Sequence, residues 1–411
     1  MTNVTSDPVA SSEPKLRRAL NTPLVTLYGL GVTVGAGIYV LVGATAAEAG
    51  SYAAVSFLVA AFVVAFTAFS YAELSTRFPV SAGEAAYVEA GFNQSWMATV
   101  VGLIVAASGV VSASAVAIGA ASYLSQFFNT SEAVLASTVV VVMGLVAILG
   151  IVQSVAVAAI ITVIEIGGLL FVMFWGFGVA EGNGFPLVET LTPHSVNHWI
   201  GIGSASILAF FAFVGFEDMA NIAEEVKEPR KTMPRAIVWT LVLATLLYLG
   251  TTIAVLVSVP IGDLTNSTAP LSLVFANAGE GTRQTFASVA IIATVNGVLI
   301  QMIMASRVIY GLADRDHLPR VFAKVSRWTQ TPIVATITVV AIIVVLSQTL
   351  PIHTLAEHTS QLVLSVFVLV NIALIRLKLT QTSDGDFFTV PMFVPILGVL
   401  TSAMLLTASF F

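Results

Sequence analysis

The stretch GLGVTVGAGIY, residues 29–39, decides how the rest of the chain is interpreted. It lies within an apolar run, residues 23–47, that is long enough to cross a lipid bilayer. Its glycines are Gly29, Gly31, Gly35 and Gly37. Each of them weakens a helix interior by roughly 1 kcal/mol relative to alanine. The run therefore predicts either very close helix packing or a helix that opens near the middle of the membrane.

The composition is typical of an integral membrane protein. Of the 411 residues, 57% are hydrophobic and 9% are charged, whereas a soluble domain carries roughly 25% charged residues. The lack of cysteine excludes disulfides and thiolate metal sites, and the five histidines show no metal-ligand spacing. The sequence has no block of basic residues large enough to indicate nucleic acid as a partner. The sequence has no nucleotide-binding motif, which argues against an ATP-driven pump. It also has no arrangement of catalytic residues, which argues against an enzyme.

Eleven apolar segments are long enough to span the bilayer as helices. They are residues 23–47, 52–77, 95–128, 132–150, 153–179, 198–224, 234–259, 284–313, 331–350, 355–376 and 390–411. None shows the period-2 alternation of a membrane barrel, so the sequence predicts an all-α bundle embedded in lipid.

Lysine and arginine set the expected orientation. With the N-terminus inside, the short inner loops carry nearly all of them, and only Arg283 falls on the outer side. We therefore expect residues 1–22 to form a cytoplasmic tail and the chain to lie in the cell membrane. Eleven spans then place the C-terminus outside.

The sixth segment, residues 198–224, is interrupted like the first. Gly215 is followed almost at once by Glu217 and Asp218. A carboxylate in the hydrocarbon is costly unless it is paired, hydrated or protonated. Adjacent acids after a glycine therefore predict unwound backbone that faces a cavity.

The positions of the two interruptions predict an internal repeat. The first and sixth segments begin two blocks of five helices, residues 23–179 and 198–376. Because five is odd, the second block runs opposite to the first in the membrane. Matching breaks in two such halves are the best sequence indication of a transporter site at the midplane. The last helix, residues 390–411, lies outside the repeat.

An opened helix supplies backbone groups to a ligand. The free N–H groups at the start of one half-helix favour an anion, and the free carbonyls at the end of the other favour an ammonium group or a metal cation. One broken helix can therefore hold both charges of a zwitterion. Glycine lets the ligand reach the backbone without a side chain in the way.

Four stretches, in order, resemble the amino acid–polyamine–organocation transporters, close to the cationic amino acid transporter branch. They are residues 31–50, 71–92, 210–237 and 305–332. The resemblance implies the leucine-transporter-type fold, an inverted five-plus-five repeat with discontinuous helices 1 and 6 and one extra C-terminal helix. It also implies alternating access, an amino acid or amine substrate, and a monomer or weak oligomer.

The same resemblance implies a set of substrate-binding residues. The substrate carboxylate should meet the backbone at Gly35, Ala36 and Gly37. The ammonium should meet carbonyls near Val32, Phe210 and Phe213, next to Gly215. An aromatic ring at Phe210 or Phe211 should act as the outer gate, and the alternative for these phenylalanines is plain packing.

Glu165 departs from the family pattern. The branch usually carries a lysine within a stretch like TVIEIGGLL, residues 162–170, and that lysine is linked to proton coupling. Here an acid stands at the position. Three interpretations stay open: a proton carrier, a ligand for sodium or a substrate amine, or a structural acid bonded to a neighbouring helix.

Other polar residues inside the spans are weaker candidates. Glu217 is expected to stabilise the broken region by accepting hydrogen bonds, and Asp218 to tune selectivity toward amines. Five more are candidates for lining the substrate path, although each alone is more often a helix–helix hydrogen bond: Thr33, Ser108, Ser112, Asn296 and Gln301.

The sequence thus predicts a secondary active transporter for a cationic or small neutral amino acid, or a related amine. Proton coupling is expected, with no cofactor apart from the transported ion. A sodium-coupled carrier and an exchanger are the alternatives within this class. Outside it, a membrane sensor that binds amino acids without carrying them is the rival. A channel would need a polar stripe along a span, and no span shows one.

Overall fold

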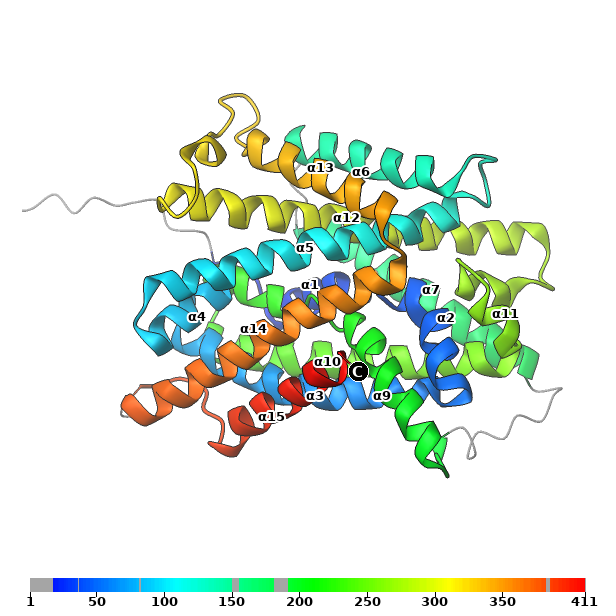
Figure 1. The fold of residues 1–411 in the computed structure, drawn as a ribbon, viewed down its shortest axis with the longest axis horizontal. Coiled ribbons are helices and arrows are strands. Elements are labelled where there is room, and N and C mark those ends of the chain that lie inside the picture. The colour runs from blue at the N-terminus through cyan, green and yellow to red at the C-terminus, as the bar shows by residue number, and fades with distance from the viewer. Residues whose placement is uncertain are drawn as a thin grey trace, which may run out of the picture.

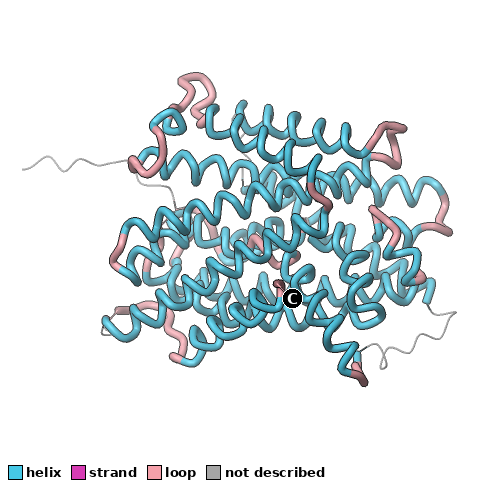
Figure 2. The backbone as a smooth tube through the Cα atoms, in the orientation of Figure 1, coloured by secondary structure: helices cyan, strands magenta, loops and turns pink. Residues whose placement is uncertain are grey.

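The computed structural model describes residues 18–35, 37–80, 83–149, 155–180, 191–381 and 385–410. Within these ranges the chain is a bundle of helices and forms no β-strand (Figures 1 and 2). Eight helical stretches there are long and apolar enough to cross a membrane, and three shorter apolar helices accompany them. The prediction of an all-α membrane bundle is confirmed. The count of eleven spans and the inverted repeat stay predictions.

The helices follow one another in an order that matches the predicted segments. The α-helices are α1 (Thr22–Val34), α2 (Gly37–Ala49), α3 (Ala53–Arg77), α4 (Gly83–Phe92), α5 (Ser95–Leu124), α6 (Glu132–Leu149), α7 (Val155–Ala180), α9 (Val196–Phe211), α10 (Pro229–Ser258), α11 (Ile261–Thr265), α12 (Glu280–Asp314), α13 (Ile333–Thr349), α14 (Ile352–Thr380) and α15 (Phe393–Ala408). The 3-10 helices are η1 (Gly50–Tyr52), η2 (Phe216–Glu225), η3 (Pro270–Phe275) and η4 (Arg320–Ala323).

Two of the predicted segments are each built from two helices. The first segment consists of α1 and α2, separated between Val34 and Gly37. The sixth consists of α9 and η2, separated by a turn that ends at Gly215. The φ angle of Gly215 is +116°, in a region that side-chain-bearing residues rarely adopt. Both interruptions predicted from the glycines are therefore present.

The two broken segments lie side by side and run in opposite directions. At one end, the N–H of Leu20 donates to the carbonyl of Glu225 at 3.0 Å. At the other, a Cβ on Gly201 would lie 2.6 Å from the carbonyl oxygen of Glu48. The contacts therefore join the start of the first segment to the end of the sixth, and the end of the first segment to the start of the sixth. This arrangement brings the two breaks to the same depth in the bundle.

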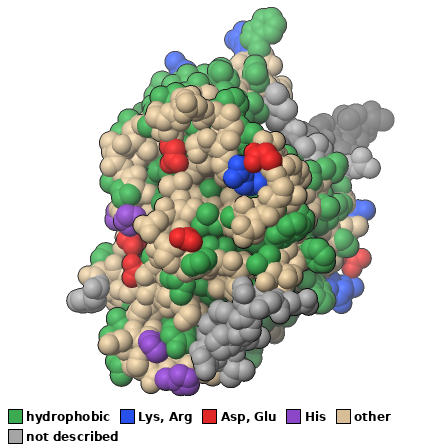
Figure 3. Space-filling model, turned by 90° about the vertical axis from the view of Figure 1, so that its right-hand side faces the viewer, with side chains coloured by type: hydrophobic (Ala, Val, Ile, Leu, Met, Phe, Trp, Pro, Cys, Tyr) green, Lys and Arg blue, Asp and Glu red, His purple; other side chains and the backbone are tan. Residues whose placement is uncertain are grey.

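Basic side chains are unevenly distributed between the two ends of the bundle. Ion pairs link Lys378 near the end of α14 to Glu73 near the end of α3, and Arg230 at the start of α10 to Asp386. Arg283 belongs to the opposite end, where α12 begins. Figure 3 views the end of the molecule on the right of Figure 1, where most of the described surface is hydrophobic or uncharged and one basic group lies against an acidic one near the middle. Which end faces the cytoplasm stays a prediction.

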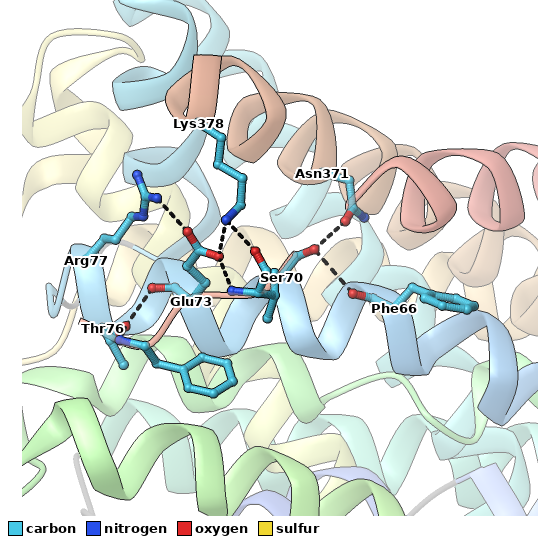
Figure 4. A network of polar contacts seen from close by, with 9 residues as sticks. Phe66, Ser70, Glu73, Thr76, Arg77, Asn371 and Lys378 are labelled. Atoms are coloured by element: carbon cyan, nitrogen blue, oxygen red, sulfur yellow. Dashed lines mark hydrogen bonds and ion pairs between the residues drawn. The ribbon is translucent and has the colours of Figure 1, made fainter. Parts of the chain in front are cut away.

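A buried network fixes the last helix to the bundle (Figure 4). Glu73 lies between Arg77 and Lys378, with ion-pair distances of 2.6 Å to each. Its carboxylate also accepts a hydrogen bond from the N–H of Val390 at 2.7 Å. Lys378 also donates to the carbonyl of Val390 at 2.7 Å. The chain that leads into α15 is thereby tied to α3 and α14.

Candidate functional site

The two helix breaks pack directly on each other. A Cβ on Gly37 would come within 2.7 Å of the Cβ of Ala212, and one on Gly215 would lie 2.9 Å from the carbonyl oxygen of Val32. Side-chain atoms cannot approach so closely without displacing their neighbours. Glycine at both positions therefore lets the opened backbone of one segment reach that of the other.

Tyr248 of α10 bridges the two breaks. Its hydroxyl oxygen lies 2.8 Å from the carbonyl oxygen of Thr33 and 2.6 Å from that of Ala212. Both carbonyls end a half-helix and lack a partner within it. Sequence reasoning missed this residue. The sequence did contain a signal for it, because Tyr248 falls in the middle of a span. Tyrosines of membrane helices usually lie at the lipid–water interfaces, so a central tyrosine suggests a specific polar contact.

A first cavity opens beside the breaks. It is lined by Val32, Thr33, Gly37, Ser112, Phe211, Val214, Gly297, Ile300 and Gln301. Its volume is about 10 Å³, which is room for about one water molecule. Six predicted site residues thus surround one space: Val32, Thr33, Gly37, Ser112, Phe211 and Gln301. An amino acid can enter it only if the surrounding helices move apart.

Two predicted aromatic residues do not line this cavity. Phe210 is fully buried and packs against Phe367, with ring centroids 5.7 Å apart. Phe213 packs edge-on against Tyr248 at 5.0 Å. Both rings thus pack against other aromatic rings, while the predicted contacts of the two carbonyls with a substrate ammonium stay predictions. Of the three phenylalanines, only Phe211 has its side chain at the cavity, so an aromatic gate there stays a prediction.

Glu165 of α7 faces the first break from the other side. Its Oε1 accepts a hydrogen bond from the Asn296 side chain at 3.2 Å and lies 3.3 Å from where a Cβ on Gly35 would stand. Its Oε2 is buried and has no hydrogen bond. The backbone carbonyl of Glu165 accepts from the Tyr39 hydroxyl at 2.6 Å. The structure therefore brings together Gly35, Glu165 and Asn296. Ala36 lies outside the described residues.

A second cavity lies toward the end of the bundle that is rich in basic residues. It is lined by Glu84, Val105, Ser108, Val214, Glu217, Asp218, Gln301, Met304, Val363, Val366 and Phe367. It shares Val214 and Gln301 with the first cavity. Of the predicted residues, it brings together Ser108, Glu217, Asp218 and Gln301.

Glu217 holds the second break in place. Its Oε2 accepts a hydrogen bond from the N–H of Gly215 at 2.9 Å, as expected for an acid that stabilises unwound backbone. Glu84 was not singled out from the sequence, although it falls in a stretch that resembles the family. Within the described residues, no group of three or more histidine, aspartate or glutamate side chains is arranged to hold a metal ion.

Comparison with known proteins agrees with this geometry. A family profile described as "Amino acid permease" matches residues 20–411. The branched-chain amino acid permease BcaP of Bacillus subtilis is 28% identical over 93% of this chain and 85% of its own length. A cationic amino acid transporter of Arabidopsis thaliana is 29% identical over 90% of this chain but 64% of its own length. The chain thus spans less than two thirds of that plant relative.

Two further comparisons extend the range of similar proteins. A methylthioribose transporter of Bacillus subtilis is 26% identical over 96% of this chain. Among solved structures, a mutant of the manganese transporter of Eremococcus coleocola superposes with a TM-score of 0.62 at 15% identity, covering 97% of this chain and 90% of that one. At that identity the likeness concerns the fold alone.

Proposed function

This chain belongs to the amino acid permease family, and we propose that it carries an amino acid or a related amine across the cell membrane by alternating access. The observation that supports this most is the meeting of two broken helices at one small cavity. Such breaks place backbone dipoles where a zwitterion needs them. Family membership and the site therefore agree on a carrier and not on an enzyme.

In this proposal, the backbone binds the amino acid group of the substrate. The first N–H groups of α2, beginning at Gly37, have no partner within the helix and favour the carboxylate. The carbonyls that end α1, near Val32, favour the ammonium. Gly37 and Val32 both line the first cavity. The inverted repeat of residues 23–179 and 198–376 is part of the same proposal, because it supplies the two halves that move.

Because the first cavity is closed, the first step of the transport cycle must be its opening. Because the space holds about one water molecule, substrate entry requires movement of α5 or α12 relative to the broken helices. Ser112 of α5 and Gly297 of α12 form the wall opposite the breaks. We propose that this wall retreats on one side of the membrane and then on the other, with the N-terminus cytoplasmic and the C-terminus outside.

We further propose that Glu165 couples transport to protons. Its free Oε2 and its closeness to Gly35 place a carboxyl group where substrate binding at the break can affect it. Sodium coupling at the same acid, and exchange without an ion, are the alternatives. The names of the relatives span branched-chain and cationic amino acids, so the proposal covers cationic and small neutral substrates.

Uptake into proteoliposomes tests this proposal. A panel of labelled amino acids and amines is offered with pH and sodium gradients imposed separately. The wild type is expected to accumulate substrate only with an inward proton gradient. Glu165→Gln is expected to lose that accumulation, because the amide cannot carry a proton. The matched control Glu48→Gln, at an exposed position of α2, should behave like the wild type.

Two results would decide against parts of the proposal. Full proton-driven accumulation by Glu165→Gln removes the coupling role of this acid. Accumulation driven by sodium alone replaces proton coupling with sodium coupling. Specific binding of an amino acid without any flux would instead favour the sensor over the transporter.

A further inference from the structure

The second cavity holds acidic groups that lack a cationic partner. Glu84, Glu217 and Asp218 all line it, and only 3% of Glu84 and 6% of Asp218 is exposed. In the described part of the chain, no lysine or arginine forms an ion pair with any of these three. An ionised buried carboxylate without a counter-charge is strongly unfavourable, so any of these acids that is ionised needs a cation from outside the chain.

The three carboxylates differ in how far the protein satisfies them. Glu84 accepts a hydrogen bond from the Tyr71 hydroxyl at 3.3 Å, and Glu217 accepts one from the N–H of Gly215 at 2.9 Å. The carboxylate of Asp218 accepts none from the described residues. The carboxylate oxygens of Asp218 are therefore available to accept hydrogen bonds from a ligand that enters the cavity.

Gln301 of α12 provides an independent indication of a ligand. Only 5% of this residue is exposed, and it lines both cavities. Its side chain makes no hydrogen bond to the described residues, although a buried amide normally finds partners. It also stands between the backbone site and the acidic cavity. A ligand that extends from one cavity into the other would pass this amide.

We infer that the second cavity is a subsite for the distal ammonium or guanidinium group of the substrate. This inference rests on the proposed function, because the amino acid group of the same molecule would occupy the first cavity. A lysine-like side chain carries its charge on a flexible four-carbon stem. Val105, Met304 and Phe367 supply apolar wall for such a stem, and the Phe367 ring favours a nearby cation.

A metal ion fits the cavity less well than an organic cation. No metal-binding arrangement of acidic or histidine side chains occurs among the described residues. The apolar walls also suit a carbon chain and not a hydrated ion. The inference therefore names the substrate class as a dibasic amino acid.

Selectivity between lysine and norleucine tests the inference, because norleucine has a similar stem without the distal amine. Uptake of both is measured in proteoliposomes of the wild type, Asp218→Asn, Asp218→Glu and Glu84→Gln. The ratio of kcat/KM for lysine to that for norleucine is expected to fall about ten- to hundredfold in Asp218→Asn and Glu84→Gln. Asp218→Glu keeps the charge and should restore most of the ratio. Asp263→Asn, exposed on α11, is the matched control and should keep the wild-type ratio.

Three outcomes would overturn the inference, and a fourth would overturn only the proposed transport. Equal losses of lysine and norleucine transport in Asp218→Asn would make its role structural. A wild type that carries norleucine while lysine neither enters nor competes would remove the subsite and leave amino acid transport intact. Competition by Mn²⁺ that disappears in Asp218→Asn would assign the cavity to a metal. If no amino acid is carried, yet purified wild type binds lysine and Asp218→Asn does not, the proposed transport fails and the subsite stands.

Discussion

Tyr248 is the side chain on which both helix breaks depend. Its hydroxyl lies within hydrogen-bond distance of a carbonyl from each broken segment. A buried carbonyl that loses its partner costs about 1–3 kcal/mol. We therefore expect Tyr248→Phe to lower the thermal stability of the purified protein and to reduce its uptake rate. Light-scattering unfolding in detergent and proteoliposome uptake measure the two effects.

The same substitution at Tyr310 of α12 serves as the control, because that hydroxyl bonds to no described residue. It should change neither measurement appreciably. If Tyr248→Phe transports at the wild-type rate with unchanged stability, the bridge between the breaks has no energetic role.

Single residues were predicted unevenly from the sequence. Gly37 and Gly215 could be predicted as site residues, because a glycine in the middle of a span indicates either close helix packing or a break in the helix. Gln301 was named only as one of several polar residues, and its position between two cavities depends on the rotation of α12. Glu84 was missed because it follows a loop and not a span. Which side chains share a cavity is a property of tertiary packing, which periodicity within one helix does not reveal.

At the level of helices, the network around Glu73 makes a separate prediction (Figure 4). Removing one member of a buried ion network leaves the others uncompensated, at a cost of about 3–5 kcal/mol. Glu73→Gln should therefore destabilise the protein strongly and loosen the chain that leads into α15. Hydrogen exchange of the 385–392 segment should rise together with the loss of thermal stability.

Glu357→Gln in α14 is the comparison, since this acid takes part in no ion pair within the described residues. It is expected to leave both quantities near the wild-type values. Wild-type exchange in the 385–392 segment of Glu73→Gln would mean that packing of α15, and not the ion network, holds this chain in place.

The helices themselves were largely predictable. Long apolar segments and two glycine-rich interruptions predicted the order of the long helices and the positions of both breaks, because a lipid environment permits few alternatives. The short helices α4 and α11 fall outside the predicted segments. The ends were less accurate. The third span stops at Leu124 and not at residue 128. The ten residues of η2 form a 3-10 helix, which composition does not distinguish from an α-helix.

At the level of the whole molecule, the response of transport to pH can be assigned to a place in the fold. At the basic end, the hydrogen bond and charge of Arg320 lower the pKa of Asp316. A carboxylate with a lowered pKa keeps its interaction at higher pH and loses it only as the pH falls through that lowered value. Asp316→Asn should therefore leave the pH profile of uptake unchanged between about pH 5 and pH 8. A shifted profile in this variant would move the pH response away from Glu165.

The closed state of the whole molecule was beyond sequence reasoning. The residues predict where a ligand can bind, but the volume of the cavity depends on the relative positions of α5, α12 and the broken helices. Those positions reflect a balance between conformations whose free energies differ by about a few kcal/mol. The sequence therefore predicts a carrier but not which conformation it prefers.

Counterflow tests the central claim most directly. Proteoliposomes are loaded with an unlabelled amino acid, diluted, and offered a trace of the same amino acid in labelled form without any ion gradient. A carrier with alternating access should show transient, saturable uptake of label that is stimulated by the internal amino acid. Absence of stimulated uptake for every amino acid and amine in the panel, by protein that remains folded and monodisperse, would contradict the account.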